Sequence, residues 1–496
     1  MTRISVRSFS QPLDRAALTV MFVLAVLTGL LLLTGDHTLP KVRDFSWQNR
    51  QVGADDRSFV LSFNRLMNWQ SVTQHLQITP QLTGKTSWAG RRLAYTLDQP
   101  VLYGRAFQVE LAKAEDDALV EADNQPKQMQ PFSGQFRSRD RVYLYIGVEP
   151  AEVGRLVMQN LTLNRKTILT PANLVVSEFK PYSSGDRVLF SANQRAKDNQ
   201  SSFDPQLYIV STGLQIHAPD TPLAPKQAAG KVKLVLDNRD YQLLKFDLAA
   251  DGQNIVVQRA AKANQGQTSL WLLRPDQDPQ LLSQQSGGDF LIAPDSNTLV
   301  IAQGQGLAVS ALSAQQDLAT LDFLPQFGMV LSFASDGSAA AMVKFNSDYT
   351  RSLFLVTNQG TQKQLFKTTG SIVRAEFDPT KQMLYCLLTK LLPGEGYNEQ
   401  PYLAAIDVAT GKLTPLLDLP GQREVQISLA PDGSALIFDQ VVAAPTEQGK
   451  ASNLQTEQGQ AIATSNLWLL PITAPGSAQV TPPQPLAAGF HARWMP

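Results

Sequence analysis

Residues able to do acid–base, nucleophilic or metal chemistry are few in this chain of 496 residues. The four histidines, His37, His75, His217 and His491, lie far apart, whereas a metal site needs ligands at close spacing. The single cysteine, Cys386, lies in the apolar run 383–388, which predicts a buried thiol and excludes an intrachain disulfide. We therefore expect no metal and no cofactor.

Sequence motifs of catalysis are also missing. The chain has no Gly-x-Ser-x-Gly elbow and no Gly-rich phosphate loop. The recurring aspartates Asp251, Asp295, Asp336 and Asp432 lie at hairpin turns, and turn formation explains them. A carboxylate pair for glycoside cleavage would have to face across a central pocket, and the sequence does not show such a pair. We expect no catalytic residue.

The composition limits the partners and the number of domains. Lys and Arg number 43 and Asp and Glu number 43, so the formal net charge is zero. A general electrostatic grip on nucleic acid needs clustered basic residues, and we expect no nucleic-acid partner. The length exceeds that of a typical single core, which predicts two or three domains.

The first segment reads as a membrane anchor. Residues 16–34 carry no charge and lie between Arg15 and Asp36, enough for a helix across a hydrocarbon core of about 30 Å. Arginines precede this segment, which predicts a cytoplasmic N-terminus (1–15), a single transmembrane helix (16–35) and export of the rest to the periplasm or another extracytoplasmic space. A cleaved signal peptide is the alternative, but the apolar core is longer than usual and no Ala-x-Ala site follows.

Residues 38–137 read as a β-sandwich. Short strands divided by turn residues are expected at 59–63, 76–80, 92–97, 102–111 and 132–136. The order of Ser-Phe-Asn-Arg-Leu-Met-Asn (62–68), Ile-Thr-Pro (78–80), Leu-Tyr-Gly-Arg-Ala-Phe-Gln-Val (102–109) and Phe-Ser-Gly-Gln-Phe (132–136) resembles the bacterial Ig-like module of cell-surface and S-layer-type proteins. That resemblance implies a spacer role.

Residues 138–496 contain a repeat. An apolar strand, a tight turn with Asp-Gly or a substitute, and a second apolar strand recur at intervals of about 41–52 residues, with one longer interval, which is the range of β-propeller blades. The copies lie at 179–190, 246–257, 292–301, 333–338, 377–385 and 429–438. Blades packed in a ring bury both faces and leave few edges exposed.

A seventh blade is split between the two ends of the repeat region. Residues 490–496 match a blade's first strand with nothing after it, and residues 139–146 match a second strand without its first. The sequence therefore predicts an all-β, seven-bladed β-propeller in which the C-terminal strand (489–496) completes blade one. Six or eight blades are the alternatives.

The repeats resemble the TolB-like propeller, whose blades carry a Phe-Ser-Pro-Asp-Gly turn. Ala-Pro-Asp-Gly at 430–433 and Ala-Ala-Ile-Asp-Val-Ala-Thr-Gly at 404–411 are the best matches. Several copies depart from the pattern: 249–252 lack the Pro, and Thr-Lys-Gln at 380–382 replaces Asp-Gly. The resemblance therefore implies a propeller architecture but no particular partner.

The two faces of such a propeller differ in the lengths of their loops. The turns between first and second strands are short and define a tight-turn face. The connections between second and third strands (193–206, 259–268, 346–351, 392–401 and 443–465) and the link 211–241 are long and polar, and define a loop face. The chain enters at a second strand and leaves at the end of a first strand, so the sandwich should lie on the tight-turn face. Solvated, partly disordered loops are the alternative to a functional loop face.

The loop face is the expected binding surface. We expect a cell-envelope scaffold that engages envelope or membrane proteins, or glycans, through loop residues Asp198, Gln200, Gln265, Asp348, Tyr349, Glu395 and Tyr397. The alternatives are a glycan-acting enzyme or glycan-binding protein that uses the axial pocket, and a structural surface-layer spacer. A ring of acidic and basic side chains at the central channel would mark the enzyme.

Overall fold

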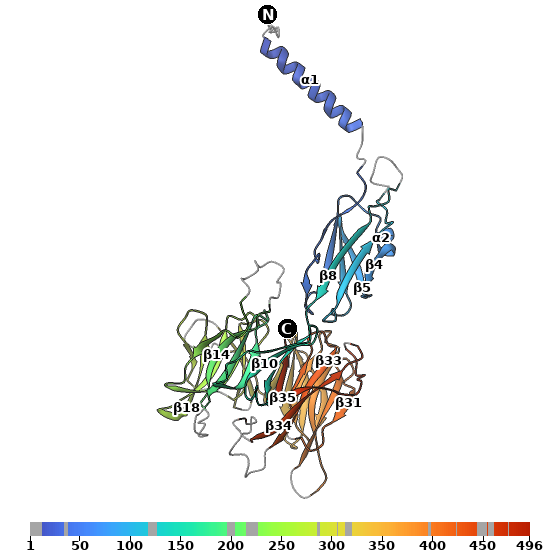
Figure 1. The fold of residues 1–496 in the computed structure, drawn as a ribbon. Coiled ribbons are helices and arrows are strands. Elements are labelled where there is room, and N and C mark those ends of the chain that lie inside the picture. The colour runs from blue at the N-terminus through green and yellow to red at the C-terminus, as the bar shows by residue number, and fades with distance from the viewer. Residues whose placement is uncertain are drawn as a thin grey trace, which may run out of the picture.

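The computed structural model describes residues 12–33, 38–117, 126–195, 204–214, 227–284, 288–304, 306–312, 320–394, 398–422, 424–443, 454, 461–474 and 476–496. Apart from the helices α1 (Pro12–Leu33) and α2 (Trp69–His75), its elements are strands (Figure 1). The expected all-β fold with a propeller-like arrangement is confirmed.

The expected membrane anchor is a misassignment. Within the described ranges, no helix combines the length and the mean hydropathy that a bilayer span requires, α1 included. The prediction of a transmembrane helix at 16–35, and of the single-pass location built on it, is therefore wrong.

The N-terminal module is a sandwich of two four-stranded sheets. One sheet has the order β1-β3-β6-β5 and the other β2-β8-β7-β4. Alternating strands such as β7, buried at every second residue, turn one face inward. Phe59 of β3 and Phe107 of β7 belong to one shared core, so the two sheets pack face to face. The strands are β1 (Val42–Phe45), β2 (Gln51–Val52), β3 (Ser58–Phe63), β4 (Leu76–Thr79), β5 (Gly84–Ala89), β6 (Arg92–Leu97), β7 (Ala106–Leu111) and β8 (Phe132–Ser138).

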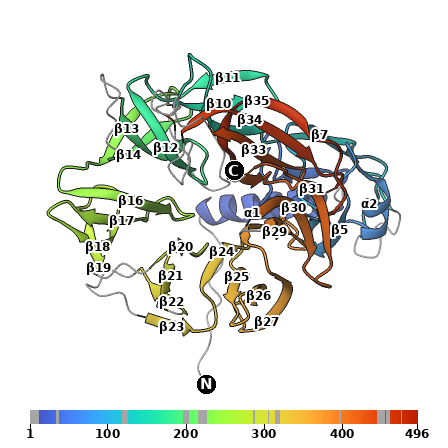
Figure 2. The same cartoon turned by 90° about the horizontal axis from the view of Figure 1, so that it is seen from below.

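Five further sheets have four strands each, paired in chain order, and lie one after another around a central space (Figure 2). They are β12 (Leu174–Pro181), β13 (Arg187–Gln194), β14 (Gln206–Ser211), β15 (Val232–Leu236); β16 (Tyr241–Leu248), β17 (Ile255–Ala261), β18 (Asn264–Leu273), β19 (Gln280–Ser283); β20 (Phe290–Ile292), β21 (Thr298–Gln303), β22 (Gly306–Ala311), β23 (Thr320–Leu324); β24 (Met329–Phe333), β25 (Ala339–Phe345), β26 (Arg351–Thr357), β27 (Gln362–Thr368); and β28 (Ile372–Phe377), β29 (Met383–Leu391), β30 (Glu399–Asp407), β31 (Leu413–Asp418).

The first hairpin of each sheet is closed by a tight turn that needs a left-handed residue. Gly337 and Gly433 supply it with φ of 70° and 72°. Where the repeat lacks glycine, Ser296 and Lys381 take φ of 64° and 62° at the same place. The degenerate copies therefore keep the turn at the cost of some backbone strain.

Neighbouring sheets bury their faces against each other. Ala341 of β25 and Cys386 of β29 belong to one core cluster, so this cluster joins two sheets. Cys386 is 1% exposed, as its apolar surroundings predict, and burial raises the pKa of its thiol.

The remaining seven strands form one sheet with the order β11-β10-β9-β35-β34-β33-β32. Its long strand β35 pairs with β34 through Gln484–Ala488 and with β9 through Gly489–Trp494. The structure pairs Gly489–Trp494 with β9, as expected from the match between residues 490–496 and residues 139–146, with Phe490 opposite Ile146 and Trp494 opposite Tyr143. The strands are β9 (Val142–Gly147), β10 (Leu156–Asn160), β11 (Arg165–Ile168), β32 (Ile427–Leu429), β33 (Ala435–Ala443), β34 (Ile462–Pro471) and β35 (Gln484–Trp494).

The sandwich contacts the tight-turn face, as the strand directions predict. The carboxylate of Asp432, in the turn between β32 and β33, accepts the backbone N–H of Tyr103 at 2.8 Å. The Arg57 guanidinium donates to the carbonyl of Pro379, in the turn between β28 and β29. Two hairpin turns therefore hold the sandwich in place.

Candidate functional site

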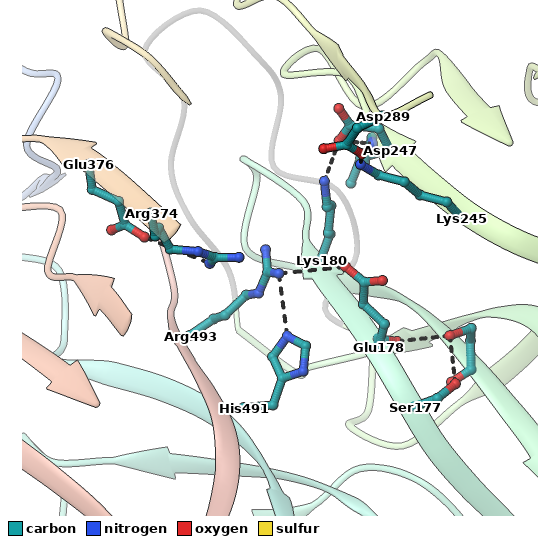
Figure 3. A network of polar contacts seen from close by, with 12 residues as sticks. Ser177, Glu178, Lys180, Lys245, Asp247, Asp289, Arg374, Glu376, His491 and Arg493 are labelled. Carbon is teal, nitrogen blue, oxygen red and sulfur yellow. Dashed lines mark hydrogen bonds and ion pairs between the residues drawn. The ribbon is translucent and has the colours of Figure 1, made fainter. Parts of the chain in front are cut away.

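Charged side chains and one histidine gather on or beside the strands nearest the centre of the ring, where Figure 3 shows them around a common space. Successive side chains of a strand point to opposite faces, so residues two apart lie on the same face. The innermost strands place such pairs in register, and β35 supplies the last pair. We call this group the axial belt; it consists of Glu178, Lys180, Lys245, Asp247, Asp289, Arg374, Glu376, His491 and Arg493.

Ion pairs of the axial belt join different sheets. The ammonium of Lys180 on β12 is 2.5 Å from Asp247 Oδ1 on β16, and Lys245 on β16 pairs with Asp289 before β20. Arg493 Nη2 on β35 is 3.6 Å from Glu178 Oε1 on β12. These partly buried pairs are screened less than surface pairs, so they help to fix how the sheets sit around the axis.

Three side-chain oxygens of innermost strands also accept a backbone N–H from another innermost strand, two of them from the next sheet and one within the seven-stranded sheet. Asp247 Oδ2 accepts from Ile292 at 2.8 Å, and Glu376 Oε2 accepts from Leu429 at 2.7 Å. The hydroxyl of Ser428 accepts from Trp494 at 3.2 Å. Each acceptor lies two residues before the turn, so one position in the repeat gives the same link between innermost strands.

A buried acid lies behind the belt. Asp439 on β33 is 2% exposed and accepts the backbone N–H groups of Gln426 at 2.6 Å and His491 at 2.7 Å. Burial raises the pKa of Asp439 to about 6, although the two N–H donors favour the carboxylate.

His491 is buried at the point where β35 has an irregular register. Its φ is 53°, and its ring lies against that of Phe179 at a centroid distance of 5.4 Å. Burial holds the pKa of His491 well below its usual range, and the charges of Arg493, Arg374 and Lys180 add to this effect. The imidazole is therefore neutral at ordinary pH, and it packs against Phe179 in the interior.

A cavity of about 340 Å³ lies between the sandwich and the tight-turn face. The sandwich contributes Ala54, Asp55 and Tyr103; the other lining residues include Phe333, Glu376, Phe377, Pro379, Pro431 and Trp494. Glu376 belongs both to this junction cavity and to the axial belt. The volume is in the range of small-molecule sites, which are mostly apolar with a few polar groups.

The residues predicted as partner-binding are brought together only in part. Asp198, Gln200, Glu395 and Tyr397 lie outside the described residues, and Gln265 is described only as part of β18. Asp348 and Tyr349 lie in the turn between β25 and β26. Asp348 accepts from the Lys367 ammonium at 2.8 Å and from the Thr350 N–H at 3.1 Å, and these bonds hold the pKa of Asp348 well below its usual range.

Sequence reasoning named a charged ring at the central channel as the mark of an alternative function but none of the residues of the axial belt, and it missed the junction cavity. The belt positions could have been found from the sequence, because most of them lie at fixed distances before a turn of the repeat. Lys180, Asp247 and Glu376 occupy equivalent positions, two residues before the residue that opens the turn. The cavity carries no such signal, since it depends on how two modules meet. Within the described ranges, no group of three or more His, Cys, Asp or Glu residues is placed to hold a metal ion.

Comparisons with known proteins give no family. No family model and no curated protein matches the chain. Solved structures similar to it include TolB from Acinetobacter baumannii, at 11% identity and a TM-score of 0.39 over 86% of this chain and 84% of that one. Another is oligogalacturonate lyase from Vibrio parahaemolyticus, at 9% identity and a TM-score of 0.43 over 82% and 95% of the two chains. These likenesses are too distant to assign an activity.

Proposed function

We propose that the chain is a binding scaffold: a closed seven-bladed propeller of TolB-like type that carries an Ig-like sandwich and engages a protein partner through its loop face. The blade number follows if β35 divides the seven-stranded sheet into two blades, which join the five four-stranded sheets in the described part of the chain.

The observation that carries this proposal is a row of exposed apolar side chains on the loop face. Second strands start at the tight turn and therefore end at the loop face. On three consecutive sheets these ends carry Phe345, Leu391 and Val442, which are 54%, 43% and 49% exposed. The corresponding end residues of β13 and β21 are the polar Gln194 and Gln303. Exposed apolar side chains that recur on one face of neighbouring sheets favour an interaction site on that face.

Tyr349 extends this row and is held in place by its turn. Its side chain is 93% exposed, its φ is 61°, and its N–H donates to the carbonyl of Asn346 at 3.1 Å. The bonds of Asp348 to Thr350 and Lys367 fix the same turn. A fixed, exposed tyrosine is ready to bind with little loss of conformational entropy, and tyrosine is enriched among the residues that dominate interfaces.

The test is quantitative affinity capture with a row variant that combines Phe345→Ser, Tyr349→Ala, Leu391→Ser and Val442→Ser. The matched control carries Leu234→Ser and Phe323→Ser, which remove apolar side chains of similar exposure from the outermost strands β15 and β23. We expect the control to retain, and the row variant to lose, the proteins captured by the unmodified chain. Identical captured sets for both variants would refute the role of the loop face.

A second candidate function has its own observation in favour. The axial belt places acidic and basic groups around the centre of the ring, which is the feature expected of a propeller that binds or cleaves charged glycans at its axis. Incubation with acidic oligosaccharides, followed by measurement of binding and of cleavage products, tests it. Cleavage that is lost in Glu178→Gln and Arg374→Gln variants would favour this function over the scaffold.

A further inference from the structure

The junction cavity combines aromatic walls with carboxylates. Tyr103 comes from the sandwich, Phe333 and Phe377 come from innermost strands, and Trp494 comes from β35. Among the cavity's lining residues the charged groups are all acidic: Asp55, Glu376 and Asp378. No lysine or arginine lines this cavity in the described part of the chain.

The acidic groups are not equally available to a ligand. Asp378 is 1% exposed and is committed to its own turn, where it accepts from the N–H groups of Met383 at 2.6 Å and Thr380 at 2.8 Å. Glu376 uses Oε2 for Leu429, whereas Oε1 makes a long ion pair with Arg374 Nη1 at 4.0 Å, beyond hydrogen-bond distance. Asp55 is exposed at the sandwich side. Two carboxylates can therefore meet a ligand, one in the floor and one at the rim.

Aromatic rings beside carboxylates are the surroundings that organic cations prefer. The face of an aromatic ring attracts an ammonium group, and the attraction grows when water is excluded. The ring of Trp494 already shows this affinity, because the Arg141 guanidinium lies 5.6 Å from its centroid. The carboxylate of Glu376 adds charge attraction in a partly buried place.

We propose that the junction cavity binds an organic ammonium group, either that of a free amine or that of a lysine side chain in a peptide. The cation enters between the two modules, stacks on Phe377 and Trp494, and is neutralised by Glu376 and Asp55. This site lies on the tight-turn face and is independent of the loop-face partner proposed above. Because both modules line it, its ligand also bridges them.

Titration calorimetry on the full chain tests the proposal with matched ligand pairs. The first pair is choline and its neutral analogue, in which a carbon replaces the nitrogen. The second pair is Nα-acetyl-lysine methylamide and the corresponding norleucine amide. We expect the cationic member to bind at least about tenfold more tightly in the pair that represents the true ligand, since charge and ring attraction both act only on the cation.

Variants then locate the binding site. Glu376→Gln keeps an acceptor for the Leu429 N–H but removes the charge, and should weaken the cationic ligand about tenfold. Phe377→Leu should weaken it by a similar factor because it removes a ring while keeping apolar volume. The matched control is Asp247→Asn, which alters the equivalent link to Ile292 in a sheet that does not line the cavity. It should leave the affinity unchanged.

Two results would overturn the proposal. One is equal affinity, or no measurable affinity at millimolar concentration, for the cationic and neutral members of both pairs. The other is cation binding that Asp247→Asn weakens as much as Glu376→Gln does. A circular dichroism melt of each variant confirms that it is folded before its affinity is interpreted. Capture results for the loop-face row bear on the partner alone, so the two proposals fail separately.

Discussion

The carboxylate of Asp432 accepts the backbone N–H of Tyr103 at 2.8 Å, across the junction between the sandwich and the ring of sheets. The two residues are 329 positions apart in the sequence. Asp432 is 1% exposed, and its other oxygen accepts from the N–H of Ser434 in its own turn. One turn aspartate therefore closes a hairpin and carries the sandwich at the same time.

The Asp432–Tyr103 bond gives a local prediction. Asp432→Ala leaves the N–H of Tyr103 without its acceptor, which costs about 1–3 kcal/mol at a buried site. We expect faster amide hydrogen exchange at residues 101–104, measured by mass spectrometry of the full chain. The control Asp336→Ala removes the equivalent turn aspartate, which bonds to Ser338 and Lys381 and not to the sandwich. If both variants expose residues 101–104 equally, the bond does not hold the junction.

The pairing of β35 with β9 gives a prediction for stability. A Cβ added at Gly489 would lie 2.4 Å from the ring of Tyr145 and 2.9 Å from the carbonyl oxygen of Ile146. Gly489→Ala should therefore lower the free energy of unfolding by about 1–3 kcal/mol. Gly266→Ala is the control, because a Cβ there meets only the Asn264 side chain at 3.8 Å. Denaturant titration of both variants checks this; an unchanged Gly489→Ala midpoint would argue against the close strand pairing.

The buried acid Asp439 gives a pH prediction. Its pKa is raised to about 6 in the folded chain, above the ordinary value of about 3.9 for an unfolded aspartate. The folded state therefore binds the extra proton, and the stability contributed by this group is lost as pH rises from about 4 through about 6.

Asp439→Asn isolates this effect. The amide can still accept one of the two N–H groups, but it stays neutral at every pH. We expect the variant to destabilise the chain more at pH 4 than at pH 7, with the difference reaching about 2–3 kcal/mol. Unfolding free energies measured at both pH values check the sign, and a difference of opposite sign contradicts the raised pKa.

A substitution at Tyr349 should affect partner binding and thermal stability differently. A left-handed φ strains a bulky residue, and glycine removes that strain. Tyr349→Gly should keep or raise the melting temperature while it weakens capture of the loop-face partner. A loss of thermal stability together with unchanged capture would show that the tyrosine has a structural role instead.

The sequence predicted the propeller-like arrangement because the repeat has a physical cause that each copy shows. Every copy needs two apolar strands and a turn with positive φ, and even Lys381 could be aligned by its place in the pattern. The same logic predicted that residues 490–496 and residues 139–146 join in one blade. It could not give the partner of Glu376 or the neighbours of Tyr103, because these depend on contacts between sheets and modules.

The membrane anchor was predicted from the uncharged apolar run at 16–34 and the arginines before it, and that prediction is wrong. The predicted loop-face residues were chosen for polarity, and most lie outside the described residues. The apolar Phe345, Leu391 and Val442 stand just before the loops at 346–351, 392–401 and 443–465, and nothing in the sequence marks them as exposed. Their exposure became visible only when the length of each strand relative to its neighbours was known.

The double pairing of β35 also constrains how the chain can fold during synthesis. The edge of β9 that receives Gly489–Trp494 is made more than 300 residues before its partner strand. Until residues 489–494 emerge from the ribosome, the innermost edge of that sheet has open N–H and C=O groups and a free apolar face, which is the condition that favours wrong pairing between chains. Translation rate and chaperone access over this interval should therefore govern the yield of folded protein more than the stability of any single sheet does.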